Sequence, residues 1–294
     1  MKSKFFIIGI TIAVTIIAII LFFLVRNNAN IDWIKDFNYE KEEVHDISIG
    51  IINPCPAIPV EFGNKKIDIE FDTGNAEGIS ITTAIRGKID YEVTGKIISA
   101  NSDGTYRGNG ESILLKSINI FGNEYTNVKS SLTDWRMYGS LRFNGLVGLE
   151  YFRNKVVTLD YKNKLIAVSS NSIDYNKLHK EKYTILPLVS PSAINHKDLL
   201  FFEGEVNGEK STIYLDTGSS RSFINIEDNY RDTTVDVKLG DKKYKFQRLR
   251  NDKIGFTDKF DYPLRLAINS DLLKSNHFVI TIDRIQNTLI ISQN

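Results

Sequence analysis

Two copies of the tripeptide Asp-Thr-Gly are the residues of this sequence best suited to chemistry. The first copy is Asp72-Thr73-Gly74 and the second is Asp216-Thr217-Gly218. One copy alone is weak evidence, because a strand that ends in a tight turn needs a glycine for ordinary structural reasons. Two copies in matching surroundings are harder to attribute to chance, and a pair of carboxyl groups can perform general acid and base catalysis.

The residues that precede the two aspartates also correspond. Val60-Glu61-Phe62-Gly63-Asn64 leads to the first aspartate, and Asn64 lies eight residues before Asp72. Gly204-Glu205-Val206-Asn207-Gly208 leads to the second, and Gly208 lies eight residues before Asp216. Each stretch predicts a hairpin with its turn at Gly63-Asn64 or Asn207-Gly208 and an aspartate at the end of its second strand.

Asp72 and Asp216 are the predicted catalytic residues, on the condition that folding brings them together. Two carboxyl groups a few ångströms apart cannot both ionise at low cost, so they share one proton and titrate as a coupled pair. The ionised member can deprotonate a water that attacks an amide carbonyl, while the protonated member donates to the carbonyl oxygen. Such a reaction requires no metal and no cofactor.

The other residues of the two tripeptides have expected supporting roles. We expect Thr73 and Thr217 to turn inward and to join the two loops through side-chain to backbone hydrogen bonds. Gly74 and Gly218 allow a close approach of the backbone and can supply N–H donors to the carboxyl groups.

The segments that must position these residues have the pattern of β-strands. From Val44 onward, runs of Ile, Val, Phe, Tyr and Thr are separated by Gly, Asn and Asp every eight to twelve residues. Residues 66–71 and 112–120 are two of the predicted strands. Outside the N-terminal segment no long stretch has the period of a helix. The sequence therefore predicts an all-β fold.

The correspondence of the two halves continues beyond the aspartates and indicates a diverged duplication. Leu146-Val147-Gly148 precedes a run that ends at Asp160, much as Ala267-Ile268-Asn269 precedes a run that ends at Asp283. Each of these later aspartates follows a strand and precedes a turn, so we expect them to be structural. The prediction is a first lobe at 44–170, a polar linker at 171–182 and a second lobe at 183–294.

The motifs taken together resemble those of the retropepsin and pepsin superfamily of aspartic peptidases, and most of all bacterial retropepsin-like peptidases fused in tandem. The resemblance covers residues 44–291. It rests on Phe71-Asp72-Thr73-Gly74, on Leu215-Asp216-Thr217-Gly218-Ser219-Ser220 and on the apolar-apolar-Gly element Leu146-Val147-Gly148 followed by Leu149-Glu150-Tyr151-Phe152. It implies two pseudo-symmetric β lobes with the apolar-apolar-Gly strand beside the catalytic loop.

The resemblance also implies a hairpin flap over the substrate, near residues 99–112, with Ser102, Asp103 and Gly104 at its tip. Asp-Gly is a strong turn signal, although an ordinary exposed hairpin would carry the same residues.

Two positions depart from the family pattern. Ser219 fits it, but Asn75 replaces the Ser, Thr or Ala of the family. Where the family has Ser or Thr, the hydroxyl hydrogen-bonds the outer carboxylate oxygen, and an Asn amide can also donate. Asn269 replaces a Gly, and we expect it to be tolerated because Asn accepts left-handed backbone angles.

Composition argues against several other classes of function. Lys plus Arg total 37 against 36 Asp plus Glu, so a net charge of +1 provides no broad field for nucleic acid. The four histidines show no zinc-ligand spacing, and we expect them at the surface. Gly218-Ser219-Ser220 does not match the Gly-x-Ser-x-Gly motif that carries the nucleophile of serine hydrolases. The single cysteine, Cys55, lies between two prolines and is expected to be packed rather than nucleophilic.

The N-terminal segment predicts a membrane anchor. Residues 5–25 are 21 uncharged and mostly apolar residues, which as a helix would span roughly 31 Å. A cleaved signal peptide is the other interpretation, but no Ala-x-Ala follows the run. Lys2 and Lys4 before the segment favour a cytoplasmic N-terminus and a body on the far side. Residues 1–26 are thus a predicted anchor and 27–43 a spacer.

The function that the sequence predicts is a membrane-anchored aspartic endopeptidase that binds an extended peptide or protein substrate between two lobes. It is expected to be monomeric, since both lobes lie in one chain. The alternative is an anchored module that binds peptides in the same way but hydrolyses them poorly or not at all. A purely structural β domain would leave the duplicated aspartates unexplained.

Overall fold

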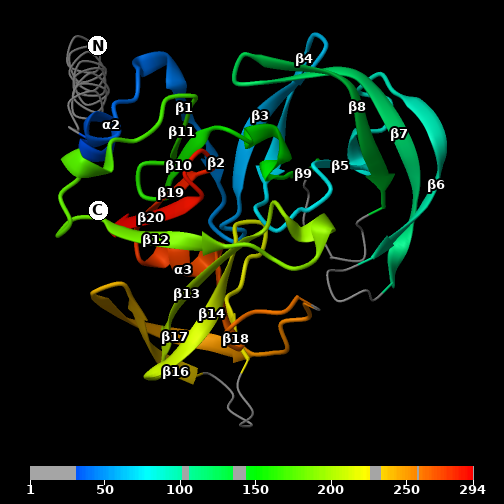
Figure 1. Ribbon diagram of the computed structural model, residues 1–294. Helices are drawn as coiled ribbons and strands as arrows, with labels where there is room; N and C mark the ends of the chain where they lie inside the picture. Colours follow the sequence, from blue (N-terminus) through cyan, green and yellow to red (C-terminus); the bar gives the residue numbers. More distant parts are fainter. Residues whose placement is uncertain (1–30, 101–105, 135–143, 226–232, 257, 294) are drawn as a thin grey trace, which may run out of the picture. The chain divides into compact units, whose positions relative to one another are not determined.

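The computed structural model describes residues 31–100, 106–134, 144–225, 233–256 and 258–293 (Figure 1). The chain divides into two compact units, residues 1–38 and 39–294. In the first unit the described part contains the short helix α2 (Asp32–Asp36). The predicted anchor at residues 1–26 lies outside the described residues. Within the part that the structure describes, no helix is long and apolar enough to cross a membrane.

The second unit consists mainly of β-strands, which confirms the prediction of a β-rich fold. One sheet has eight described strands. Their order is β2 (Ser48–Ile49), β3 (Pro56–Phe62), β4 (Lys65–Phe71), β9 (Gly145–Val147), β5 (Ile79–Thr82), β8 (Asn123–Thr133), β7 (Tyr106–Ile120) and β6 (Glu92–Ala100). Strand β3 also pairs with β7, so the sheet closes on itself.

The other sheet has twelve described strands. Their order is β1 (Val44–Asp46), β11 (Leu165–Ser169), β10 (Val156–Asp160), β19 (Phe278–Asp283), β20 (Thr288–Gln293), β12 (Thr184–Val189), β13 (Leu200–Val206), β14 (Glu209–Asp216), β18 (Leu264–Asn269), β15 (Phe223–Ile224), β17 (Lys242–Asn251) and β16 (Thr233–Leu239). Strand β13 also pairs with β16. The short helical segments are η1 (Lys41–Glu43), η2 (Thr83–Ile85), η4 (Leu149–Phe152), η5 (Tyr175–Lys177), η6 (Ile194–His196) and α3 (Ser270–Ser275).

The strand order of the first half recurs in the second. The series β3-β4-β9-β5-β8-β7 corresponds to β13-β14-β18-β15-β17-β16, and the extra pairing β3–β7 corresponds to β13–β16. In each half the aspartate-bearing strand, β4 or β14, lies parallel to a later strand, β9 or β18. On its other side that later strand pairs antiparallel with β5 or β15. The repeated sequence landmarks therefore belong to strands with the same hydrogen-bonded neighbours.

Both predicted tight turns are present. Strands β3 and β4 are joined at residues 63–64, and Gly63 has a φ of 61°. Strands β13 and β14 are joined at residues 207–208, where Asn207 and Gly208 have φ values of 51° and 82°. Left-handed angles at these two positions are accessible to Asn and Gly with little strain, which explains why the sequence signal was reliable.

The two halves meet through strands β10 and β19, which pair antiparallel. Thr158 lies opposite Thr281, and their hydroxyl oxygens are 2.7 Å apart. These two threonines occupy corresponding places in the two halves of the sequence. Because the halves share hydrogen-bonded strands, residues 39–294 form one compact unit. The predicted linker at 171–182 lies between β11 and β12 and contains η5.

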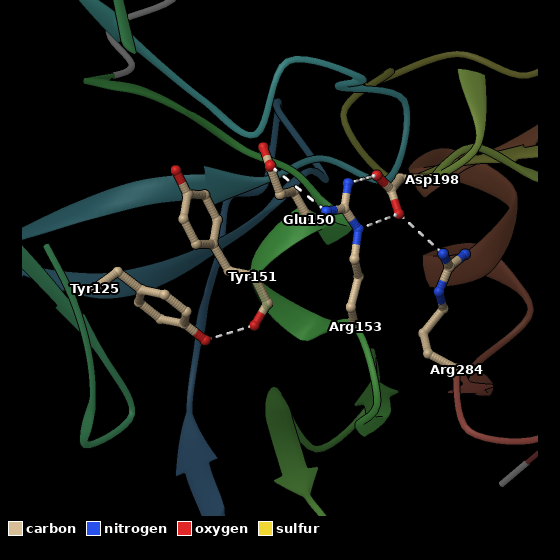
Figure 2. A network of polar contacts seen from close by, with 6 residues as sticks. All are labelled: Tyr125, Glu150, Tyr151, Arg153, Asp198 and Arg284. Carbon is tan, nitrogen blue, oxygen red and sulfur yellow. Dashed lines mark hydrogen bonds and ion pairs between the residues drawn. The ribbon is translucent and has the colours of Figure 1, made fainter. Parts of the chain in front are cut away.

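A polar network also ties sequence-distant segments together (Figure 2). The buried carboxylate of Asp198 accepts hydrogen bonds from Arg153 Nε at 3.1 Å and from Arg284 Nη2 at 2.9 Å. Glu150 lies 3.7 Å from the Arg153 guanidinium, and Tyr125 donates to the carbonyl of Tyr151 at 2.6 Å. Arg153 follows η4, Asp198 precedes β13 and Arg284 follows β19, so the network joins three connections between strands.

The predicted flap corresponds to strands β6 and β7, which form a long antiparallel hairpin (Figure 1). Ala100 pairs with Tyr106 at its end. The proposed tip residues Ser102, Asp103 and Gly104 lie outside the described residues. The hairpin carries two exposed apolar side chains near this end, Ile98 and Tyr106.

Candidate active site

Asp72 and Asp216 stand at the ends of strands β4 and β14. The Asp72 N–H donates to the carbonyl of Val147 at 2.9 Å, which continues the pairing of β4 with β9. Asp216 lies opposite Asn269 in the pairing of β14 with β18. Side chains alternate along a strand, so Phe71 and Leu215 enter the hydrophobic core and each aspartate faces the other way.

Thr73 and Thr217 join the two aspartate-bearing turns by reciprocal hydrogen bonds. Each threonine N–H donates to the other's Oγ1 at 3.0 Å. The Thr73 hydroxyl donates to the carbonyl of Leu215 at 3.0 Å, and the Thr217 hydroxyl donates to the carbonyl of Phe71 at 2.6 Å. Both side chains are buried. The predicted cross-link is confirmed, and it holds together two turns that are 144 residues apart in sequence.

The cross-link brings the two carboxyl groups into contact. The side chains of Asp72 and Asp216 are hydrogen bonded to each other. A Cβ added to Gly74 would lie 2.7 Å from the Asp216 Cγ, and one added to Gly218 would collide with the Asp72 carboxyl group. Each turn therefore requires a glycine because its backbone packs against the carboxyl group of the other turn.

The electrostatic surroundings favour one shared proton. Burial raises the pKa of Asp216 well above its usual value, and the neighbouring Asp72 raises it further. Backbone donors act in the opposite direction: the Gly218 N–H reaches Asp216 Oδ1 at 2.9 Å, and the Ser219 N–H also donates to this carboxyl group. The Gly74 N–H reaches Asp72 Oδ1 at 2.7 Å. These donors hold both carboxyl groups in orientation.

The side chains of Asn75 and Ser219 do not take the role that the resemblance implied. The Asn75 amide nitrogen donates to the carbonyl of Gly78 at 3.1 Å, and its oxygen accepts from the Glu77 N–H at 3.1 Å. The Ser219 hydroxyl donates to the carbonyl of Arg221 at 3.3 Å. Each side chain closes a local turn. Ser219 instead supports the pair of carboxyl groups of Asp72 and Asp216, the dyad, through its N–H. The Asn75 amide could have donated to a carboxylate, but its described contacts are with Gly78 and Glu77.

The reason we expected Asn269 to be tolerated is wrong. Its φ is −119°, an extended angle, and the corresponding Gly148 has a φ of −92°. A glycine is needed at 148 because an added Cβ would collide with the carbonyl of Asn75. Asn269 instead has room for a side chain, which donates to the carbonyl of Arg221 at 2.6 Å. The difference between the halves is one of space and not of backbone conformation.

Two residues beside the dyad were missed from the sequence. Glu70 and Tyr214 stand two places before Asp72 and Asp216, on the same face of their strands, and both are buried. The Glu70 carboxylate accepts from Asn53 Nδ2 at 2.7 Å. Burial, followed by the nearby Asp72, raises the pKa of Glu70 to about 7. The period of two along a strand is the signal that could have identified these residues.

A second layer of polar groups lies behind the dyad. The Ser270 hydroxyl donates to the carbonyl of Thr217 at 2.7 Å and contacts the Tyr161 hydroxyl at 2.9 Å. Cys55 is buried nearby. Burial is the main cause that raises the pKa of its thiol, and the negative charges of Glu70, Asp216 and Asp72 add to it. A protonated, buried thiol agrees with the prediction that Cys55 is packed.

Other candidate groups have structural partners. Asp160 accepts from the Asn163 N–H at 2.9 Å, and Asp283 accepts from the Ile285 N–H at 2.9 Å. Both therefore close the turn after a strand, which confirms the structural role predicted for them. The prediction that all four histidines are exposed is wrong for His196, which is buried with its Nδ1 2.6 Å from Asp258 Oδ2.

Among the residues that the structure describes, no group of three or more His, Cys, Asp or Glu side chains could hold a metal ion. Comparison of the sequence with models of known protein families finds no match. Comparison with curated proteins also finds no match.

Proposed function

We propose that the protein is an aspartic endopeptidase whose catalytic groups are Asp72 and Asp216. One observation carries the proposal: the threonine cross-link holds two carboxyl groups from separate halves of the chain in direct contact. A structural aspartate is normally paired with a donor or a cation, because two carboxyl groups in contact are costly unless one is protonated. The repeated strand order supports the further proposal of two pseudo-symmetric β lobes of the pepsin and retropepsin type.

The proposed reaction uses water as the nucleophile. The ionised carboxylate takes one proton from a water while the water oxygen bonds to the carbonyl carbon, and the protonated carboxyl gives its proton to the carbonyl oxygen. This produces a gem-diol. When the C–N bond breaks, the carboxyl group that took the water's proton donates it to the leaving nitrogen, and the other carboxylate takes a proton from the gem-diol. The dyad is then restored with one proton, without a metal or a cofactor.

The proposed substrate is a peptide or an unfolded protein segment in extended conformation. The β6–β7 hairpin supports this proposal, because an extended peptide can pair with strand backbone while alternate side chains enter pockets. The exposed Ile98 and Tyr106 give this hairpin an apolar surface for such a contact.

The anchor, the location and the oligomeric state are also proposals. The uncharged residues 5–25 would hold the protein in a membrane with its N-terminus in the cytoplasm and its catalytic part on the extracytoplasmic side. Because one chain supplies both carboxyl groups, a monomer is sufficient. The small net charge of +1 gives no reason to propose a nucleic-acid partner.

The test is cleavage of a mixture of unfolded proteins by the full chain, purified in detergent, over a range of pH. We expect cleavage by the wild type and a loss of at least about 1,000-fold in Asp216→Asn, because an amide can neither hold nor accept the shared proton. Asp72→Asn should behave in the same way. Asp160→Asn is the matched control, since that aspartate closes a turn away from the dyad. Equal cleavage by wild type and Asp216→Asn would refute the proposal.

A second candidate function has one observation in its favour. The Asn75 amide nitrogen donates to the carbonyl of Gly78, whereas the family resemblance implies a hydroxyl at this position that donates to the catalytic carboxylate. The protein would then bind extended peptides through the same face without hydrolysing them. Saturable binding of a peptide inhibitor with a central hydroxyl group, together with no cleavage at any pH, would favour this binding module over the peptidase.

A further inference from the structure

The Tyr214 hydroxyl is a polar group beside the dyad that the proposed reaction leaves unused. Tyr214 lies on β14 and only 5% of its surface is exposed. Its ring is stacked on Phe201 with centroids 5.1 Å apart and meets Phe256 edge-on at 4.8 Å. These contacts fix the direction of the hydroxyl, because the two torsion angles of the side chain cannot change without displacing other rings.

The hydroxyl and the Asp216 carboxyl group lie next to the same residue, Gly74. A Cβ added to Gly74 would lie 2.6 Å from Tyr214 Oη and 2.7 Å from Asp216 Oδ1. Both oxygens therefore lie beside Gly74, in the turn that carries the opposite aspartate. Tyr214 and Asp216 reach this point from one strand, because residues two apart share a face.

No described residue forms a hydrogen bond with the Tyr214 hydroxyl, and its oxygen is not among the fully buried side-chain atoms of the described residues that lack a partner. Phenol groups that are buried in proteins normally have a partner, because loss of hydration is costly. Other buried tyrosines of this chain follow the rule: Tyr39 contacts Thr158, and Tyr161 contacts Ser270. A rigid donor without a partner among the described residues, next to a carboxyl group of a reactive pair, is arranged to bind an oxygen that arrives from outside the protein.

We propose that the Tyr214 hydroxyl donates a hydrogen bond to the oxygen that the dyad holds, first that of the attacking water and then that of the gem-diol. This inference rests on the proposed function. Tyr214 transfers no proton and forms no covalent bond. Its contribution is a fixed dipole aimed at an oxygen whose environment changes during the reaction.

The electrostatic surroundings suit a donor. Burial, followed by the charges of Asp216 and Asp72, raises the pKa of Tyr214 well above its usual value. The phenol therefore keeps its proton at acidic and neutral pH. The corresponding residue of the first half is Glu70, which is bonded to Asn53. The two halves thus flank the dyad with unlike groups, a carboxyl group from the first half and a phenol from the second.

The decisive variant is Tyr214→Phe in the full chain, because it keeps the ring and removes only the oxygen. Loss of one fixed donor typically reduces kcat by about 100-fold, so we expect kcat to fall by roughly 10- to 100-fold with little change in KM. Affinity for a peptide inhibitor with a central hydroxyl group should fall by a similar factor. Affinity for the same peptide with a methylene in place of that hydroxyl should not change.

The matched control is Tyr125→Phe, which removes a hydroxyl that donates to the carbonyl of Tyr151 away from the dyad. It should leave both inhibitor affinities unchanged. An unchanged kcat and an unchanged preference for the hydroxyl-bearing inhibitor in Tyr214→Phe would overturn the inference. A wild-type chain that cleaves nothing would instead refute the proposed function, and the inhibitor comparison would still test Tyr214.

A second measurement covers the case in which Tyr214→Phe does not fold. Replacement of Tyr214 by a ring-fluorinated tyrosine keeps both the ring and the hydroxyl. The fluorine resonance should shift when the hydroxyl-bearing inhibitor binds and shift much less with the methylene analogue. Equal shifts with both inhibitors would contradict a hydrogen bond from Tyr214.

Discussion

At the scale of single residues, the buried Glu70 is one group through which pH acts on this fold. It lies on the same face of β4 as Asp72, and its side-chain carboxylate accepts a hydrogen bond from Asn53 Nδ2. Its pKa rises from 4.5 to about 7, mainly through burial and secondly through the charge of Asp72. The charged form of Glu70 is therefore less stable in the folded protein than in water.

The predicted consequence is a loss of stability between acid and neutral pH. The folded chain binds the Glu70 proton more tightly than the unfolded chain, so the stabilisation is complete below pH 4.5 and is lost as the pH rises through about 7. A shift of this size corresponds to roughly 3 kcal/mol in the free energy of unfolding. Glu70→Gln should remove this dependence.

Urea unfolding of the wild type and Glu70→Gln at pH 5 and pH 8 measures the effect. Glu61→Gln, on the exposed face of β3, is the control and should retain the wild-type difference. If Glu70→Gln lost as much stability between pH 5 and pH 8 as the wild type, the lower stability at pH 8 would come from another group.

At the scale of elements, the two aspartate-bearing turns depend on one another. Each is short and closed by a glycine that packs against the carboxyl group of the other. Neither turn can satisfy its buried threonine alone, because the partners of Thr73 are in the second half and those of Thr217 are in the first. The site is consequently formed only when both halves are folded.

Thr217→Val tests this dependence with almost no change in shape. The substitution leaves the Thr73 N–H and the carbonyl of Phe71 without a buried partner. We expect the free energy of unfolding to fall by about 2–4 kcal/mol, since each orphaned buried group costs about 1–3 kcal/mol. Thr126→Val, at an exposed position of β8, should change it by less than about 0.5 kcal/mol. Similar stabilities for the two variants, measured by thermal unfolding, would contradict the cross-link.

At the scale of the whole second unit, residues 39–294, Asp198 connects segments from both halves. Its buried carboxylate is shared by Arg153 and Arg284 (Figure 2). Burial lowers the pKa of Arg284, whereas the hydrogen bond to Asp198 raises the pKa of Arg153. Arg284 is the more buried of the two cations, so it depends more on the Asp198 charge.

Asp198→Asn should therefore destabilise the unit strongly. Removal of one member of a buried ion pair costs about 3–5 kcal/mol, and because the Arg153 side chain is 40% exposed we expect the lower end of this range. Glu111→Gln is the control, because its ion pair with Arg86 is largely solvated and should contribute less than about 1 kcal/mol. Chemical denaturation of both variants measures the difference, and equal losses would show that the Asp198 network does not stabilise the unit.

The sequence alone determined the β-rich character of the fold and the two hairpin turns. It also led to the hypothesis that Asp72 and Asp216 lie together. These features depend on local rules: side chains alternate along a strand, and left-handed turns select Gly and Asn. The duplication then implied that residues 144 positions apart have corresponding places.

Only the tertiary structure decided the surroundings of the dyad. It turned Asn75 toward Gly78, gave Asn269 space where Gly148 has none, and placed Glu70 and Tyr214 beside the aspartates. These outcomes depend on which distant backbones approach closely and on how much water they exclude. Such distances are set by the packing of both halves. The period of two along a strand could place Glu70 and Tyr214 on the same face as the aspartates, but it could not give their burial or the contacts of Asn75 and Asn269.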